Sequence, residues 1–256
     1  MRVIQYFVAV VVIVTFLPTS SFAQFVQNGL HTRVSDGANA EANGGNDSSL
    51  IGINAGGVNN WGLNQWDLSS LTGETVTSVS LVFDVQENFT NANHGSTLDT
   101  ISIHEIFSTN LGWLEGGQVV NGANVETNGG ATFNFQSQTS ATTGTAWQDA
   151  AGNDLANLLG AFDTTAIDSI AGYDQGTGPD TVSFNLPVAL VQGWVDDPSS
   201  FAGLVLQSND NGDNLGRFNF LGNPGTLSIT TAAVPEPSSL AIVGMFGIAA
   251  FMRRRR

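Results

Sequence analysis

The sequence contains no cysteine and no lysine, and only seven of its 256 residues are basic. Without cysteine the chain has no disulfide framework, no thiolate metal site and no thiol nucleophile. Without lysine it has no amine nucleophile either. Charged residues of either sign make up 11% of the chain, and its polarity comes mainly from Asn, Gln, Ser, Thr and Gly. This composition favours strands and turns over helices.

Basic residues are nearly absent from the middle of the chain. Between residues 24 and 234 only Arg33 and Arg217 are basic, whereas this stretch holds every carboxylate except Glu236. It therefore carries 21 carboxylates against two guanidinium groups, a formal charge of −19. Such a surface repels phosphate backbones, which excludes nucleic acid as a partner. The same charge favours bound cations, and structural calcium is the one cofactor that we consider.

A short apolar run near the N-terminus predicts a cleaved signal peptide. Arg2 precedes the run Phe7–Leu17, and the small residues Ser21 and Ala23 occupy positions −3 and −1 before Gln24. At about 11 residues the run is too short to span a bilayer, which disfavours the alternative of an uncleaved anchor. We predict that residues 1–23 are removed by signal peptidase after export.

The C-terminus combines three elements in a fixed order. Pro235, Glu236 and Pro237 are followed by the apolar stretch Leu240–Met252 and then by four arginines. As a helix this stretch reaches only ~20 Å, less than the hydrocarbon core of about 30 Å, so it predicts a single short transmembrane helix suited to transient residence. Basic residues at both chain ends favour the cytoplasmic side, which places residues 24–234 outside the cytoplasm.

This order of Pro-Glu-Pro, short apolar helix and arginine cluster resembles the PEP-CTERM sorting signal. The resemblance covers the tail, residues 232–256, and implies cleavage by exosortase in a Gram-negative bacterium. It implies transient anchoring in the inner membrane, then delivery to the outer surface or extracellular matrix. A permanent tail anchor is the alternative. The implied partners are the export machinery, signal peptidase, exosortase and the membrane. The residues predicted to direct sorting and processing are Ala23, Gln24, Pro235, Glu236, Pro237, Arg253, Arg254, Arg255 and Arg256.

The stretch 24–231 has the pattern of an all-β domain. Turn-forming Asn, Asp and Gly clusters separate runs in which apolar and polar residues alternate with a period of two, as expected for strands with one buried face. Many short strands of this kind predict a jelly-roll-like β-sandwich. The runs are Val79–Val85, Ile101 with Ile103, Phe133 with Phe135, Val182–Leu186, Leu204 with Leu206, Phe218 with Phe220, and Leu227 with Ile229.

Two short helices are expected within this domain. Asp154 is placed to cap a helix that carries Leu155–Leu159. Pro187 suits the start of a second helix, Val188–Trp194. The segment Thr230–Glu236 is expected to be a linker that leads into the tail.

Several segments of the domain resemble disaggregatase-related (DNRLRE) domains. Trp66 stands where that family usually has phenylalanine, and Asn185-Leu186-Pro187 replaces its usual Asp-Val-Thr. The resemblance implies a non-catalytic jelly-roll module of secreted proteins, some of them carbohydrate-binding. The segments are Gln65–Leu71, Val76–Leu81, Ile101–His104, Trp113–Gly116, Val182–Asn185, Leu190–Trp194 and Gly203–Leu206.

Catalytic motifs are not evident. His31, His94 and His104 lack metal-ligand spacing, and no G-x-S-x-G elbow occurs. With 21 carboxylates, some pair meets the separation that glycoside hydrolysis needs by chance alone, so the sequence nominates none. We expect that the protein is not an enzyme, with a secreted polysaccharide-degrading enzyme as the alternative. The acids near expected strand or helix ends are Glu105, Glu115, Asp196 and Asp197.

Clustered oxygen ligands make calcium the candidate metal. The main candidate is the segment containing Asn209, Asp210, Asn211 and Asp213, and an Asn-Gly hairpin turn would need the same residues for backbone reasons. A calcium-dependent adhesive module is therefore the second alternative function. Further clusters are Asp36 with Asn39 and Asn46 with Asp47.

Tryptophan rings are candidates for sugar contact. Trp61, Trp113 and Trp147 border polar loops and are the glycan-contact candidates, with extracellular polysaccharide as the partner. Trp66 and Trp194 follow the apolar periodicity and are expected in the core. The sequence as a whole predicts an exported surface or matrix protein whose body is a structural or carbohydrate-associated module.

Overall fold

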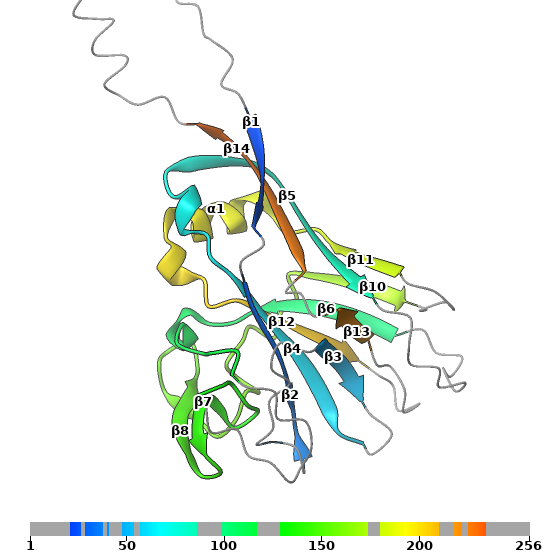
Figure 1. Ribbon diagram of the computed structural model, residues 1–256, viewed down its shortest axis with the longest axis vertical. Coiled ribbons are helices and arrows are strands. Elements are labelled where there is room, and N and C mark those ends of the chain that lie inside the picture. Colours follow the sequence, from blue (N-terminus) through cyan, green and yellow to red (C-terminus); the bar gives the residue numbers. More distant parts are fainter. Residues whose placement is uncertain are drawn as a thin grey trace, which may run out of the picture.

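The structure is a computed structural model that describes residues 21–26, 29–37, 40, 48–53, 57–85, 99–116, 129–173, 180–209, 218–221 and 225–233. The described residues are mostly β-strands with one α-helix, in agreement with the composition. Figure 1 shows β1 and β14 side by side at one end of the molecule and the hairpin of β7 and β8 at the other.

The strands form a small three-stranded sheet and a continuous eleven-stranded antiparallel sheet, whose two halves we call the outer sheet and the central sheet. The outer sheet contains β1 (Ser21–Val26), β14 (Thr226–Ala233), β5 (Glu74–Val85), β11 (Asp180–Phe184) and β13 (Phe218–Leu221). The central sheet contains β2 (Gly29–Ser35), β4 (Asn59–Trp66), β12 (Leu204–Asn209), β6 (Asp99–Glu105) and β10 (Asp168–Tyr173). Strand β3 (Ser48–Ile53) pairs with both β13 and β4 and so joins the two sheets. The small sheet contains β7 (Phe135–Ser140), β8 (Thr143–Gln148) and β9 (Asp154–Leu155).

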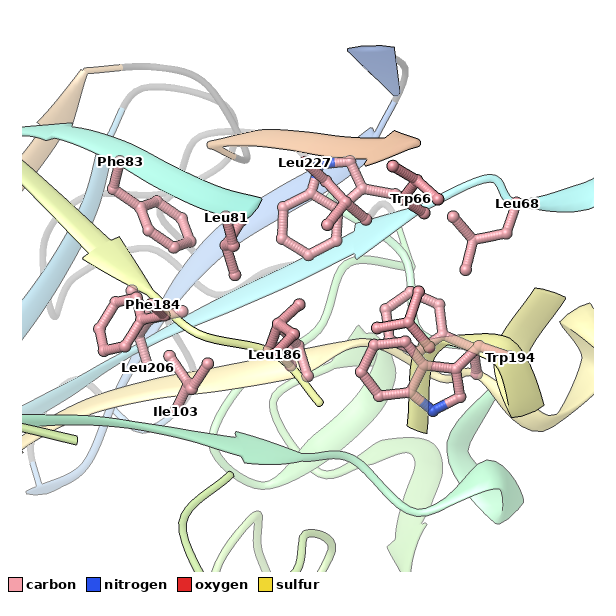
Figure 2. Close-up of a cluster of buried hydrophobic side chains, with 14 of the residues drawn as sticks. Trp66, Leu68, Leu81, Phe83, Ile103, Phe184, Leu186, Trp194, Leu206 and Leu227 are labelled. Carbon is pink, nitrogen blue, oxygen red and sulfur yellow. The ribbon is translucent and has the colours of Figure 1, made fainter. Parts of the chain in front are cut away.

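The main hydrophobic core lies between the outer and central sheets. Figure 2 shows Leu81 and Phe83 of β5 with Leu227 of β14 on one side, and Ile103 of β6 with Leu206 of β12 on the other. Each of these five side chains is buried. In β5 and β14 they alternate with more exposed residues, so the alternation predicted from the sequence is confirmed for these two strands. Burial of apolar surface at about 25 cal/mol per Å² makes this packing the main source of stability.

A second core covers the opposite face of the central sheet. Leu63 of β4 and Val205 of β12 are buried there against Trp113 and Trp147, which belong to the segment between β6 and β10. Because this segment packs on the central sheet, strands β4, β6 and β12 are covered on both faces. The sequence predicted one buried face for the runs that form β6 and β12, and for these two strands that expectation is wrong.

One of the two predicted helices is confirmed. Helix α1 (Val188–Asp196) begins directly after Pro187 and buries Val191, Trp194 and Val195 against the main core. The other expected helix is wrong, because Asp154 and Leu155 form β9 and pair with Gln148 and Trp147 of β8. Pairing with β8 places that segment beside the second core, and this tertiary contact outweighs its helical pattern. The remaining short elements are the 3-10 helices η2 (Ser69–Leu71), η3 (Ser108–Asn110) and η4 (Pro198–Ser200).

The predicted linker is partly strand. Thr230–Ala233 belongs to β14, so only Val234 separates the last strand from Pro235. Residues 234–256, including the predicted transmembrane helix, lie outside the described residues. Within the described ranges, no helix is both long and apolar enough to cross a bilayer.

Gly203, directly before β12, lies very close to the backbone of β4, and a substitution can test how much this close approach matters. Its φ is +113°, and an added Cβ would lie 2.5 Å from the backbone oxygen of Asn64. We expect Gly203→Ala to lower the free energy of unfolding by more than Gly73→Ala, whose residue also has positive φ (+85°) but no atom within 4 Å of the added Cβ. Backbone strain alone should cost about 1–3 kcal/mol in both variants. Urea denaturation measures the difference, and equal losses would show that the close approach at Gly203 does not matter.

Candidate functional site

The predicted signal-peptidase site and the strand that leads into the C-terminal tail lie side by side at one edge of the outer sheet. Strand β1 runs antiparallel to β14, so the start of β1 lies beside the end of β14 (Figure 1). The register pairs Ser21 with Ala232, Ala23 with Thr230, Gln24 with Ile229 and Val26 with Leu227. We call the paired strands β1 and β14 the terminal edge. Because the strands are antiparallel, the chain enters β1 and leaves β14 at the same end of the sheet.

The end of β14 is held firmly by β5. The pairing of these strands shifts between Thr230 and Thr231, which leaves Thr77 of β5 as an extra residue. The Thr77 hydroxyl donates a hydrogen bond of 2.9 Å to the Thr230 carbonyl. The buried Thr231 side chain, 2% exposed, bonds the carboxylate of Glu74. A β-bulge of this kind bends the bulged strand, here β5, and increases the local twist.

Helix α1 braces the same end of β5. The Gln192 side chain accepts a hydrogen bond from the backbone N–H of Val76 (2.7 Å) and donates to the carbonyl of Glu74 (3.1 Å). It also donates to the Asp196 carboxylate at 2.7 Å. The side chain thus ties the helix to β5 at the residues that pair with Thr231 and Ala233 of β14. Helix α1 is therefore hydrogen-bonded to β5, the strand next to the terminal edge.

The sorting and processing residues fall partly on this edge. Ala23 and Gln24, which flank the predicted cleavage point, lie in the middle of β1. Pro235, Glu236, Pro237 and the four terminal arginines lie outside the described residues. No strand was predicted at 21–26, because the signal-peptide assignment ended inside this stretch, at Ala23. The alternation of Leu227, Ile229 and Thr231 toward the core was the signal that β14 extends past residue 229.

The three glycan-contact candidates are buried, which corrects that expectation. Trp113 and Trp147 are 1% and 0% exposed, and Trp61 is 8% exposed and stacks on Phe133 at a ring-centroid distance of 5.2 Å. The indole N–H of Trp113 donates to the carbonyl of Ala202, and that of Trp147 to the carbonyl of Thr132. Such rings belong to the second core and offer no open face to a sugar.

The predicted core tryptophans are confirmed. Trp66 and Trp194 are 3% and 2% exposed, and both lie next to Phe201 with centroid distances of 6.5 Å and 4.4 Å. Trp194 also donates a hydrogen bond of 2.6 Å to the Glu105 carboxylate. Four of the tryptophans, Trp66, Trp113, Trp147 and Trp194, are thus core residues whose indole N–H is satisfied within the protein.

The structure places only part of the predicted calcium ligands. Asn209 is the last residue of β12, and Asp210, Asn211 and Asp213 lie outside the described residues. Both carboxylate oxygens of Asp36 accept hydrogen bonds from Asn59, one from its backbone N–H (2.8 Å) and one from its side-chain amide (2.6 Å). Among the described residues no group of three or more His, Cys, Asp or Glu side chains is arranged to hold a metal ion. The other candidates, Asn39, Asn46 and Asp47, lie outside those residues.

The predicted carboxylates serve separate structural roles. Burial raises the pKa of Glu105, and the hydrogen bond from Trp194 opposes this rise. Burial likewise raises the pKa of Glu115, against the influence of the nearby His31 and its backbone N–H. Asp197 caps η4 by accepting a hydrogen bond from the Ser199 N–H. Asp196 accepts from Gln192 of the same helix, α1.

His104 is buried rather than on an open polar face. It is 3% exposed, its Nδ1 lies 2.9 Å from the Asp163 carbonyl, and its Nε2 lies 2.8 Å from the Gln207 amide nitrogen. A carbonyl only accepts and an amide nitrogen only donates, so Nδ1 carries the proton and Nε2 accepts. Ser102, 2.9 Å from Nε2, is a further donor. His104 is therefore a neutral core histidine with both nitrogens engaged.

This arrangement predicts how stability depends on pH. Burial lowers the pKa of His104 in the folded state, so below its ordinary value of about 6.5 the unfolded chain takes up a proton that the folded chain resists. Stability should fall as the pH decreases from ~7 to ~5, by at most about 1.4 kcal/mol per pH unit for this one group. The raised pKa of Glu105 acts with the opposite sign, because its contribution is present at low pH and is lost as the pH rises through its folded pKa.

The His104→Gln variant isolates the histidine, because glutamine does not titrate. Urea denaturation across this pH range should show a smaller decrease in stability on acidification for the variant than for the wild type. An unchanged pH dependence in the variant would mean that His104 is not the group that resists protonation.

Comparison with known proteins identifies the tail. Residues 233–256 match the PEP-CTERM protein-sorting motif. No curated protein matches the chain. The motif marks an exported protein whose tail is sorted by an exosortase in association with the membrane and toward the cell surface. It begins at Ala233, which is the last residue of β14 and of the terminal edge.

Proposed function

We propose that the chain is exported and loses residues 1–23, and that its short tail helix then holds it in the inner membrane for a time. Exosortase processing near Pro235–Pro237 then releases the body to the outer surface or extracellular matrix of a Gram-negative bacterium. The observation that supports this proposal most strongly is the sorting motif at residues 233–256, which starts where the last strand ends. A folded body followed at once by a sorting signal is the arrangement that release of the body requires.

For the body we propose a non-catalytic, jelly-roll-like β-sandwich module that is structural or carbohydrate-associated. The packing of the outer and central sheets around one core supports the sandwich. The strand, helix and strand of the DNRLRE resemblance coincide with β11, α1 and β12, which supports that relationship. The separate structural roles of Glu105, Asp196 and Asp197 support a body without catalysis.

The purified body tests this part of the proposal. Incubated with a panel of bacterial polysaccharides, it should retain one or more of them without releasing shorter products. Product release would favour the polysaccharide-degrading alternative. Loss of thermal stability on adding a chelator would favour the calcium-dependent adhesive module.

The ends of the mature protein test the export and sorting route. Mass spectrometry of the surface fraction should find a chain that begins at Gln24 and ends near Pro235–Pro237. Replacing Arg253–Arg256 with serine should weaken membrane retention of the precursor, because the tail then lacks the charges that hold its end in the cytoplasm. Surface protein that retains Met1 would show that the N-terminal segment is not removed.

A further inference from the structure

Signal-peptide residues cover part of the edge of β14. Ser21, Phe22 and Ala23 pair with Ala232, Thr231 and Thr230. Removal of residues 1–23 leaves only Gln24–Val26 on this edge, and these pair with Leu227–Ile229. The opposite edge of β14 stays paired with β5 along its whole length. Processing at the N-terminus therefore uncovers three residues of β14, Thr230–Ala232. Together with Ala233, which ends the strand, we call them the exposed strand end.

The backbone of the exposed strand end points toward the side that is uncovered. The Thr230 carbonyl faces β5, because it accepts a hydrogen bond from Thr77. Since N–H and C=O groups alternate between the two edges of a strand, those of Thr231 face β1. Its buried side chain is fixed by Glu74, so the residue cannot rotate to satisfy these groups elsewhere. Loss of Ser21–Ala23 leaves them ready to pair with another strand.

The exposed strand end lacks the features that protect sheet edges. Proteins guard free edges with charges, prolines or bulges on the edge strand itself. The exposed strand end carries no charged side chain, and the next proline in the chain is Pro235. The bulge lies on β5 and not on β14. An unprotected edge of this kind is suited to binding an extended segment of a partner by β-augmentation.

We propose that the exposed strand end is the docking strand for the tail-processing peptidase, which pairs an extended segment of its own with it. In the precursor Ser21–Ala23 occupy this edge, so removal of the signal peptide must come before processing of the tail. The proposal rests on the proposed function, namely removal of residues 1–23 and cleavage near Pro235–Pro237. The partner is a peptidase because the strand leads straight into the sorting motif at Ala233. From Thr231 to Glu236 an extended chain covers only ~17 Å, so an enzyme aligned on this strand lies beside the bond to be cut.

The first experiment keeps Ser21–Ala23 paired with the exposed strand end. Ala23→Val puts a β-branched residue at position −1, which the small pocket of signal peptidase rejects, while valine remains suited to β1. In cells that contain the exosortase, this variant should retain both the signal peptide and the tail. Adding Phe22→Pro removes the N–H that faces Thr231 and breaks the pairing of β1 with β14. The double variant should keep its signal peptide but regain tail processing.

The second experiment alters the docking strand itself. Ala232→Lys places a charge on the exposed strand end and should slow tail processing several-fold, with normal removal of the signal peptide. Ser228→Lys is the matched control. Ser228 lies on the same face of β14 as Ala232 and is also half-exposed, but it stays paired with Phe25 of β1 after residues 1–23 are removed. Both released bodies should melt at similar temperatures, which shows that lysine does not unfold the sheet.

Three results would overturn the proposal. The first is tail processing of Ala23→Val at the wild-type rate. The second is equal processing of Ala232→Lys and Ser228→Lys. The third is a loss of self-association of the released body in Ala232→Lys with unchanged processing, because the edge would then bind a second copy. Failure of the proposed function looks different, since the wild type would then keep Leu240–Arg256.

Discussion

Replacement of Pro235, Glu236 and Pro237 by alanine leaves an uncleaved, membrane-bound precursor in place of the released body. Proline disfavours regular helix and favours extended backbone in the residue before it, so we expect Pro235 and Pro237 to keep a helix from forming at Glu236. Alanine removes this barrier and is the strongest helix former, so the apolar helix can extend back toward Ala233. A scissile bond within a helix has its backbone groups engaged and does not fit an extended substrate cleft.

Fractionation with intact-mass analysis of wild type and variant measures this effect. The control is the double variant of Ser238 and Ser239 to alanine, which changes the same stretch of tail but leaves Pro-Glu-Pro in place and should be processed. If the wild type keeps Leu240–Arg256 on its whole surface population, the tail is a permanent anchor and this prediction is wrong.

Replacement of Trp113 by alanine should lower the free energy of unfolding by about 3–5 kcal/mol, the range for a large aromatic residue removed from a core. The side chain is 1% exposed in the second core, and its indole N–H donates a 2.7 Å hydrogen bond to the carbonyl of Ala202. Alanine leaves a cavity beside Trp147 and Val205 and a buried carbonyl without its donor. A loss of this size is a large part of the stability of an ordinary domain.

Two variants separate packing from hydrogen bonding in this test. Trp113→Phe keeps most of the apolar volume and should lose about 1–3 kcal/mol, because the Ala202 carbonyl loses its partner. Leu114→Ala removes the neighbouring side chain, which is 49% exposed, and should change stability by less than about 0.5 kcal/mol. Urea denaturation measures all three. Unchanged stability of Trp113→Ala together with lost polysaccharide binding would instead restore Trp113 as an exposed sugar platform.

Burial on both faces of the central sheet explains the main sequence-based errors about this body. His104 alternates with Ile103 and would face solvent on a strand with one buried face, but the segment between β6 and β10 covers that face. The same cover buries Trp61, Trp113 and Trp147, although each borders polar residues in the sequence. Which segment packs on the second face of a sheet depends on contacts between residues distant in the chain, and local alternation carries no information about them.

Local chemistry was sufficient for the features that lie within one stretch of chain. The sorting tail is such a feature, because Pro-Glu-Pro, the apolar stretch and the arginines act through their order and spacing alone. The alternation of Leu81 with Phe83 and the proline before α1 likewise predicted local structure correctly. The pairing of β1 with β14 is of another kind, because it joins Ser21 to Ala232 from opposite ends of the chain. Only the tertiary structure brings the predicted signal-peptidase site and the start of the sorting motif to one edge, since strand pairing is decided by packing of the whole sheet rather than by the residues at either end.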